Sequence, residues 1–305
     1  GLEHPSVTET LAPLAETGNV PVSLLEHQVE GRLGLESLGV LAEKRVRLLC
    51  LSHVNNELGS VNDPAPLVRA LEAASPATRL FLDGVQAVGK RPLVDMPWDR
   101  VAGYSLSAHK INGPKGIGLL VYDARLRLTP LIHGGKQQHG VRSGTLPVPL
   151  ILGLAKTLER AIARAAENEA RFRALSRRLI DGLREQAQRL PELHVLFNSL
   201  AEDDTARQSP AIVNFSFPPV EGEVLLHHLE EKGIYVGLGS ACSAQSKEPS
   251  RILTGIGRGE EEARASLRVS FGPENTLDDV DRFLEEFSRA YRALYPTFKE
   301  KAAAR

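Results

Sequence analysis

Hydrophobic positions in the first third of the chain follow helical and strand-like patterns in turn. Residues 6–18 carry apolar side chains with helical spacing, and a glycine marks the expected helix end. The segment VPVSLL and a second short helical stretch follow, and residues 46–54 form a continuous apolar run typical of a buried strand. Pro64 predicts the start of another helix, and RLFLD, which ends at Asp83, predicts another strand.

This alternation of strands and helices predicts an α/β protein whose sheet is mostly parallel and covered on both sides. Ligands of such sheets bind beyond the carboxyl ends of the strands. Asn56 and Asp83 both follow or end a predicted strand, so we expect them at that edge.

The pattern changes after Pro149 to one long helical stretch. We then predict the strand AIVNFSF, the helix EGEVLLHHLEEKG, the strand IYVGL, a loop through Cys242, the helix PSRILTGIG, the strand SLRVSF and a final helix from about Leu277. The chain is therefore expected to form two domains. Residues 1–165 would form the larger one, and residues 166–305 a smaller α+β domain that carries the loop with the cysteine.

Composition narrows the class of partner. Of the 305 residues, 42% are hydrophobic and 25% are charged, which is close to the average for globular proteins and predicts a sizeable core. Lys and Arg number 37 against 38 Asp and Glu, so no basic excess is available for nucleic acid or an anionic membrane. The expected partner is a small molecule or another protein.

Targeting and cysteine patterns point to a soluble cytoplasmic protein. No apolar run reaches the ~20 residues of a membrane helix, and no signal-peptide pattern opens the chain. Cys50 and Cys242 form no CxxC pair, which predicts neither a disulfide framework nor a zinc site and favours a reducing compartment. The chain begins with Gly1 rather than Met, which suggests a processed, trimmed or partial chain.

The first group of residues with chemistry is Asp83 together with the run YSLSAHK, which ends at Lys110. A lysine in a small-residue turn beside Ser107 and His109 is unusual for a surface loop and predicts a bound anion. If Lys110 forms a Schiff base with a cofactor, the hydroxyl and the imidazole can bind a phosphate of that cofactor. Asp83 can pair with a pyridinium nitrogen, so that the ring acts as an electron sink. The alternative is that Asp83 caps a turn and Lys110 is a surface residue.

The second group is GSACSAQSKEPS, in which Cys242 lies among Gly, Ser and Ala before a helix that begins at Pro249. This composition predicts an exposed, flexible segment and suits a mobile nucleophile. A thiol titrates near ~8.5, so attack at neutral pH requires thiolate formation helped by neighbours or by the substrate complex. The alternative, a small buried hydrophobic residue, is our interpretation of Cys50 in its apolar strand.

Five segments in order resemble the cysteine desulfurases of the class V aminotransferase group, which have the type I pyridoxal-phosphate fold. They are HVNNELGSV, FLDGVQAVGK, SLSAHKINGPKGIGLL, LIHGGKQQHGVRSGT and GLGSACSA. The resemblance implies pyridoxal 5'-phosphate as cofactor, with Lys110 as its aldimine lysine. It implies that Asp83 contacts the pyridine nitrogen and that Gln86 donates a hydrogen bond to the phenolic oxygen.

The same resemblance assigns the phosphate contacts. Ser107 and His109 match phosphate-binding residues of the same subunit. Thr145, in RSGT, matches a phosphate contact that family members supply from the other subunit, so a homodimer is implied.

Four residues match the family's substrate chemistry. His4 matches the histidine that stacks on the cofactor ring and moves protons. Asn56 matches a residue that contacts the cofactor oxygen and the substrate carboxylate, although a turn asparagine is the plain alternative. Arg268 matches the arginine that holds the substrate α-carboxylate through two parallel hydrogen bonds. Cys242 matches the nucleophile that attacks the substrate sulfur.

The resemblance implies removal of sulfur from L-cysteine, which gives L-alanine and a persulfide on Cys242. Sulfur would pass to acceptors in iron-sulfur cluster assembly or RNA thiolation. Two other activities remain open for the same residues, those of a selenocysteine lyase and of a cysteine-sulfinate desulfinase. A non-catalytic truncated homologue that acts as a binding protein is the alternative from another class.

Two segments differ from the family pattern. Family members carry an N-terminal SGATEANN-like turn whose Thr and backbone amides bind the phosphate at a helix N-terminus. No such turn occurs in this sequence, so we expect part of the phosphate cup and of the large sheet to be missing. The loop GGKQQHGVRSGTLPV stands where relatives commonly have GGGQERGLRSGTENV, so its RSGT core is kept but the loop bordering the site is altered.

Overall fold

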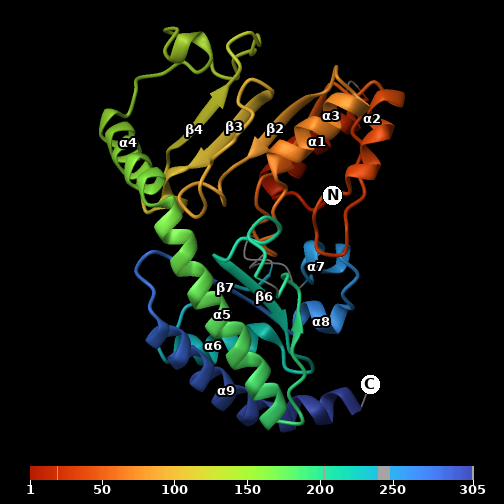
Figure 1. The fold of residues 1–305 in the computed structure, drawn as a ribbon, viewed down its shortest axis with the longest axis vertical. Helices are drawn as coiled ribbons and strands as arrows, with labels where there is room; N and C mark the ends of the chain where they lie inside the picture. Colours follow the sequence, from red (N-terminus) through yellow and green to blue (C-terminus); the bar gives the residue numbers. More distant parts are fainter. Residues whose placement is uncertain (19, 202, 240–247, 304–305) are drawn as a thin grey trace. The chain divides into compact units, whose positions relative to one another are not determined.

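The structure is a computed structural model that describes residues 1–18, 20–201, 203–239 and 248–303 (Figure 1). The chain divides into two compact units. One contains residues 38–53 and 64–166, and we call it the parallel-sheet unit. The other contains residues 1–37, 54–63 and 167–305, and we call it the antiparallel-sheet unit.

The parallel-sheet unit is built on four strands in the order β1-β2-β3-β4. Strands β1 (Leu48–Ser52), β2 (Arg79–Asp83) and β3 (Val101–Ser107) pair in parallel, and β4 (Gly118–Tyr122) joins β3 antiparallel. Its helices are α2 (Gly39–Glu43), α3 (Pro64–Ala74), η2 (Ala108–Ile111), η3 (Gln138–Gly140) and α4 (Val148–Ala163), and η1 (Leu35–Leu38) precedes α2. The predicted mostly parallel sheet, both predicted strands and the helix start at Pro64 are confirmed.

Alternation of side chains explains why β2 is a strand at this place. Leu80 and Leu82 are fully buried, and the alternate residues Arg79, Phe81 and Asp83 are partly or more fully exposed. Helix α3 buries Leu67 and Leu71 at helical spacing. Strand β3 was not predicted, because its small polar residues indicated a turn. It forms because β2 and β4 pair with it on both sides.

The antiparallel-sheet unit has the strand order β5-β6-β7. Its strands are β5 (Leu196–Phe197), β6 (Ile212–Ser216) and β7 (Ser266–Ser270), and both pairings are antiparallel. Its helices are α1 (Pro5–Glu16), α5 (Ala165–Arg189), α6 (Gly222–Glu230), α7 (Arg251–Gly255), α8 (Glu260–Arg264) and α9 (Leu277–Ala303). This arrangement agrees with the predicted α+β character of the C-terminal region.

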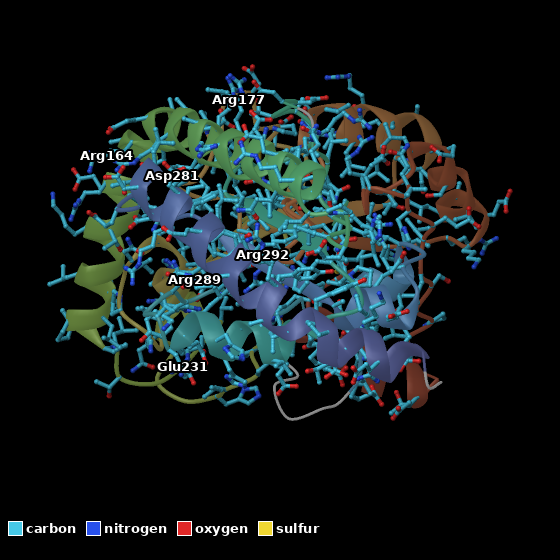
Figure 2. All side chains as sticks on the ribbon, turned by 90° about the horizontal axis from the view of Figure 1, so that it is seen from below. Arg164, Arg177, Glu231, Asp281, Arg289 and Arg292 are labelled. Carbon is cyan, nitrogen blue, oxygen red and sulfur yellow. The ribbon has the colours of Figure 1, made fainter. Side chains whose placement is uncertain are left out.

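Aromatic rings form the centre of that unit. Phe287 of α9 contacts Phe217 edge-on, with 5.2 Å between ring centroids, and lies 5.6 Å from Phe215 of β6. The opposite face of α9 is charged, and Asp281, Arg289 and Arg292 lie exposed on it (Figure 2). Among the helices that the structure describes, none is long and apolar enough to cross a membrane.

Two predicted elements are wrong in detail. The single long helical stretch is two helices, because Arg164 leaves helical geometry between α4 and α5 with φ −103° and ψ 6°. The predicted strand IYVGL makes only an isolated bridge between Gly237 and Arg268. Its backbone meets β7 at one position, which is too little for a strand.

The two units are not the continuous stretches expected from the sequence. Residues 1–37 and 54–63 belong with 167–305 in one compact unit. The functional division into a cofactor-binding domain 1–165 and a small domain 166–305 stays a prediction.

Replacing Phe287 tests the aromatic core. Phe287→Ala should lower the free energy of unfolding by about 3–5 kcal/mol, because a fully buried ring leaves a cavity. Leu277→Ala, at an exposed position of the same helix, should change it by less than about 0.5 kcal/mol. Urea unfolding of both variants measures the difference, and equal effects would contradict the assigned core.

Candidate active site

The predicted site residues are divided between the two units. The parallel-sheet unit holds Asp83, Gln86, Ser107, His109, Lys110 and Thr145. The antiparallel-sheet unit holds His4, Asn56 and Arg268. Cys242 lies outside the described residues.

Asp83 is the last residue of β2 and is paired in register with Ser52 and Ser105. Its Oδ1 accepts hydrogen bonds from the Val85 backbone N–H at 3.0 Å and from the Ser105 hydroxyl at 3.4 Å. No hydrogen bond to its Oδ2 is found within the described part of the chain. One carboxylate oxygen is thus held by the fold, and the other can pair with a cationic ring nitrogen.

A buried pair that the sequence analysis missed supports this strand end. The Tyr104 hydroxyl lies 3.0 Å from Nδ1 of His53, and the His53 backbone N–H donates to the Asp83 carbonyl at 2.9 Å. Burial, with a contribution from the Arg91 charge, lowers the pKa of His53 to about 3, and burial raises the pKa of Tyr104. Both side chains are therefore neutral near pH 7.

Gly84, the next residue, is required by the same pair. A Cβ at this position would lie 1.9 Å from the ring of Tyr104, which is only 1% exposed. The one sequence signal for this arrangement was the polar run SHVNNE directly after an apolar strand.

Lys110 follows the carboxyl end of β3 in η2. The Ser107 hydroxyl and Nδ1 of His109 lie 2.8 Å apart at the same strand end. The Lys110 side chain is exposed and makes no hydrogen bond or ion pair with any residue that the structure describes. A hydroxyl, an imidazole and an amine thus follow one another within four residues, which suits a phosphate and an aldehyde on one ligand.

Gln86 and Thr145 are also in this unit. The Gln86 Oε1 accepts a hydrogen bond from Lys90, which leaves the Gln86 amide nitrogen as the group that can donate to a ligand. Thr145 is exposed and follows Gly144, whose φ of +119° is typical of glycine.

A turn formed by residues 54–61 organises the site residues of the antiparallel-sheet unit. Asn55 is 2% exposed, and its Oδ1 accepts hydrogen bonds from the backbone N–H groups of Glu57 and Leu58, at 2.9 and 3.0 Å. Its Nδ2 donates to the Leu2 carbonyl at 3.0 Å. The turn therefore binds the N-terminal segment that carries His4.

His4 is the N-cap residue of α1. Its Nδ1 accepts a hydrogen bond from the Ser6 backbone N–H at 3.1 Å, so the neutral ring carries its proton on Nε2. Arg251 donates to the carbonyls of Gly1 and Glu3, at 3.1 and 2.8 Å, which further fixes this segment.

Asn56 and Arg268 meet through the same turn. Arg268 lies on β7, and its Nη1 donates to the Asn56 carbonyl at 3.0 Å. The side-chain Oδ1 of Asn56 is buried and has no hydrogen-bond partner within the described part of the chain. A buried polar atom without a partner costs about 1–3 kcal/mol, so this amide is suited to a ligand group.

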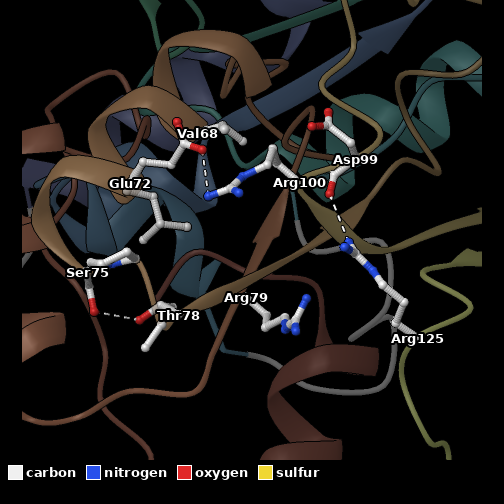
Figure 3. A pocket seen from close by; sticks show the side chains of 11 residues that line it. Val68, Glu72, Ser75, Thr78, Arg79, Asp99, Arg100 and Arg125 are labelled. Carbon is white, nitrogen blue, oxygen red and sulfur yellow. Dashed lines mark hydrogen bonds and ion pairs between the residues drawn. The ribbon is translucent and has the colours of Figure 1, made fainter.

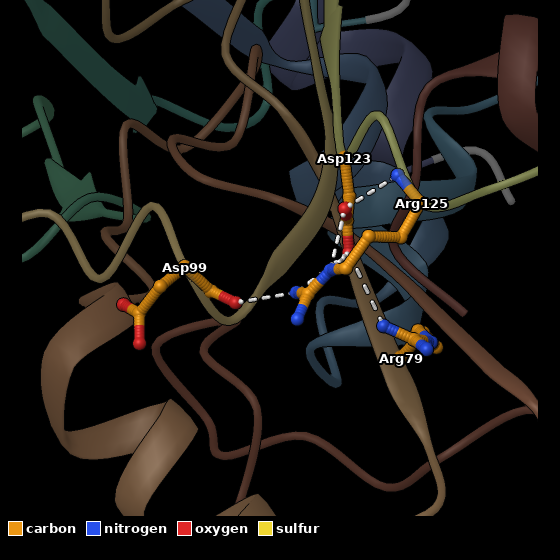
Figure 4. Close-up of polar contacts among 4 residues, drawn as sticks. All are labelled: Arg79, Asp99, Asp123 and Arg125. Carbon is orange, nitrogen blue, oxygen red and sulfur yellow. Dashed lines mark hydrogen bonds and ion pairs between the residues drawn. The ribbon is translucent and has the colours of Figure 1, made fainter.

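A hollow at the opposite end of β2 is a different feature (Figure 3). Arg79, Arg100 and Arg125 line it, but each is paired with an acidic group. Arg100 pairs with Glu72 (Figure 3), and Arg79 and Arg125 pair with Asp123 (Figure 4). The hydrogen bonds from Arg125 lower the pKa of Asp123 to about 2. Arg79 begins β2 whereas Asp83 ends it, and no predicted site residue lines the hollow.

Comparison with known proteins identifies the family. The profile of the family described as "Aminotransferase class-V" matches residues 1–283. A cysteine desulfurase of Gluconacetobacter diazotrophicus is 36% identical over 285 residues, which covers 93% of this chain and 68% of that protein. The cysteine desulfurase IscS of Pseudomonas entomophila is 37% identical over 295 residues, which covers 96% and 69%. The chain belongs to the cysteine desulfurase family.

Solved structures agree with this family. A NifS-like protein superposes with a TM-score of 0.84 at 29% identity, and the superposition covers 96% of this chain and 74% of that protein's chain. The cysteine desulfurase CsdA of Escherichia coli, in its S-sulfonic acid form, superposes with a TM-score of 0.71 at 25% identity. This superposition covers 96% of this chain and 71% of the CsdA chain. The predicted type I fold is confirmed, and the family depends on pyridoxal phosphate.

The residues present fit this cofactor. Asp83 offers a carboxylate oxygen, Gln86 an amide donor, and Ser107 and His109 a hydroxyl and an imidazole at one strand end. Lys110 supplies the amine. The individual roles of these residues remain predictions.

Substituting Gly84 tests the support behind Asp83. Gly84→Ala should destabilise the protein by about 1–3 kcal/mol, because the added methyl group displaces the Tyr104 ring. Gly39→Ala is the matched control, since its Cβ meets no atom within 4 Å, and it should leave the melting temperature unchanged or slightly higher. Equal melting temperatures for the two variants would refute the requirement for glycine.

Proposed function

We propose that this chain is a cysteine desulfurase that converts L-cysteine to L-alanine and transfers the sulfur to Cys242. One observation carries the proposal. The carboxylate of Asp83 and the Ser107–His109–Lys110 group lie at the carboxyl ends of neighbouring parallel strands, in a chain 36–37% identical to cysteine desulfurases.

Bound pyridoxal phosphate would supply an electron sink for the substrate carbon. Asp83 would keep the ring nitrogen protonated through its Oδ2, and Gln86 would donate to the phenolic oxygen. Ser107 and His109 would hold the phosphate. Lys110 would hold the cofactor through its amine and move a proton at the substrate carbon.

Other residues would handle the substrate. Arg268 and Asn56 would bind the α-carboxylate, and the protonated Nε2 of His4 would exchange a proton with the bound substrate. The Cys242 thiolate would attack the substrate sulfur, so that an S–S bond forms and the C–S bond breaks. The electron pair would remain on the carbon, which takes up a proton to become alanine.

We also propose a homodimer in which Thr145 contacts the phosphate of the partner subunit. Exposed apolar side chains support a partner surface on the parallel-sheet unit. The exposed apolar side chains are those of residues 119–121 in β4, of Leu131 between β4 and α4, and of Leu152 in α4. The Leu131 side chain is 97% exposed. Apolar surface of this kind marks interaction sites more often than free surface.

Sulfur on Cys242 would pass to a protein acceptor of iron-sulfur cluster assembly or RNA thiolation. The support is the name IscS carried by several relatives. We propose a cytoplasmic location, because a reactive free thiol such as Cys242 suits a reducing compartment, where thiols are kept from forming disulfides. Neither nucleic acid nor a membrane is proposed as a partner.

Removing the thiol tests the reaction. Cys242→Ala should keep cofactor absorbance and bind L-cysteine but form no persulfide, because only the sulfur-accepting step requires the thiol. Cys50→Ala, in β1, is the control and should keep persulfide formation. Mass spectrometry of the protein with L-cysteine measures both. Sulfide release by Cys242→Ala at the wild-type rate would refute the role, and retained selenide release from selenocysteine would favour the lyase.

Charge on the apolar surface tests the dimer. The double variant Leu131→Asp with Leu152→Asp should be monomeric, because buried unpaired carboxylates oppose association. Val94→Asp, at a 74% exposed position outside this surface, should leave the mass unchanged. Light scattering during size-exclusion chromatography measures the mass. A dimer of undiminished stability in the double variant would place the interface elsewhere.

A further inference from the structure

Glu57 is a buried carboxyl group in the turn 54–61, directly after Asn56. Its side chain is 7% exposed, and its Oε2 accepts a hydrogen bond from the Ser250 hydroxyl at 2.5 Å. Ser250 is the N-cap of α7, where its hydroxyl oxygen accepts a hydrogen bond from the Leu253 N–H at 3.2 Å. The carboxyl group thus connects the turn to the start of α7.

Gly239 also lies close to the Glu57 carboxyl group. A Cβ on Gly239 would lie 3.2 Å from the Glu57 Oε2, so the backbone there passes at contact distance from the carboxyl group. The charged groups that act on Glu57 are Arg268 of β7 and Arg251 of α7. Arg251 is engaged with two backbone carbonyls, whereas Arg268 holds the carbonyl of Asn56, the residue next to Glu57.

Burial raises the pKa of Glu57 to about 7 from its ordinary value of 4.5, while the Ser250 hydrogen bond and the charges of Arg268 and Arg251 act in the opposite direction. The carboxyl group therefore changes its charge close to neutral pH.

We propose that Glu57 is a positioning residue of the carboxylate-binding site. Its hydrogen bond to Ser250 holds the turn against α7, and its charge sets how strongly Arg268 attracts a substrate carboxylate. This inference rests on the proposed function, in which Arg268 and Asn56 bind that carboxylate.

Electrostatics gives the direction of the effect. A neutral Glu57 does not oppose the attraction between Arg268 and an incoming carboxylate. An ionised Glu57 neutralises part of that charge and repels the ligand. Carboxylate binding should therefore weaken as the pH rises through about 7.

The decisive variant is Glu57→Gln, which keeps an acceptor for Ser250 but is neutral at every pH. L-alanine is the probe, because it carries the α-carboxylate and has no sulfur to transfer. Its affinity for the cofactor-loaded protein is measured by absorbance at pH 6 and pH 8.5. The ratio of variant to wild-type affinity cancels the titration of L-alanine itself.

This ratio should be near one at pH 6 and should rise to roughly three to ten at pH 8.5, the range that a partly screened charge provides. Glu223→Gln, at an exposed position of α6, is the matched control and should give a ratio of one at both pH values. Ser250→Ala removes the hydrogen bond but keeps the charge, so it should weaken L-alanine binding at both. A Glu57→Gln ratio that does not change with pH would overturn the proposal.

A stability measurement does not depend on the proposed function. Folded Glu57 keeps a proton that the unfolded chain releases between pH 4.5 and 7, so the wild-type free energy of unfolding should fall across this interval relative to Glu57→Gln. Urea unfolding at several pH values measures this. If wild type binds L-alanine and desulfurates cysteine but the ratio is constant, this proposal alone fails. If wild type does neither, the proposed function fails and this proposal fails with it, even where unfolding shows the titration.

Discussion

The buried amide of Asn55 is the interaction on which the site residues of the antiparallel-sheet unit depend. Its oxygen binds two backbone N–H groups of the turn 54–61, and its nitrogen binds the Leu2 carbonyl. A buried amide has to satisfy its donors and acceptors within the protein, so few arrangements are permitted. His4, Asn56 and Arg268 come from three distant parts of the chain. Asn56 lies in this turn, Arg268 donates a hydrogen bond to its carbonyl, and the segment that carries His4 is bound through Leu2.

In the parallel-sheet unit, the site residues are brought together by strand pairing rather than by a single side chain. Parallel pairing brings the ends of β2 and β3 to one edge, where Asp83 and Ser107 lie. The neutral His53–Tyr104 pair fills the space behind Gly84 without placing a second charge beside Asp83. The pair therefore adds no competing charge at the strand end where Asp83 is predicted to meet the cofactor nitrogen.

Local patterns predicted much of the fold, and the failures concern segments whose structure depends on pairing with distant parts of the chain. Strand β2 was predicted to the residue from the segment RLFLD, and its side chains alternate between buried and more exposed positions. Strand β3 was missed, since small polar residues have no strand signal and its pairing depends on two neighbours distant in sequence. The expected strand IYVGL has the right composition but meets a partner only at Gly237. Strand propensity without a partner does not make a strand.

The sequence by itself determined the family and predicted the reactive groups, because lysine, aspartate and cysteine carry their chemistry in the side chain. It also determined most helices, whose hydrogen bonds are local. Only the tertiary structure decided which polar groups are hydrogen-bonded within the protein and which can bind a ligand. Within the described residues, the oxygen of Asp83 that accepts no hydrogen bond, the Asn56 Oδ1 without a partner and the raised pKa of Glu57 all follow from burial and from contacts between residues far apart in the chain. Such contacts leave no periodic signal in a sequence, since solvent exclusion depends on every neighbour at once.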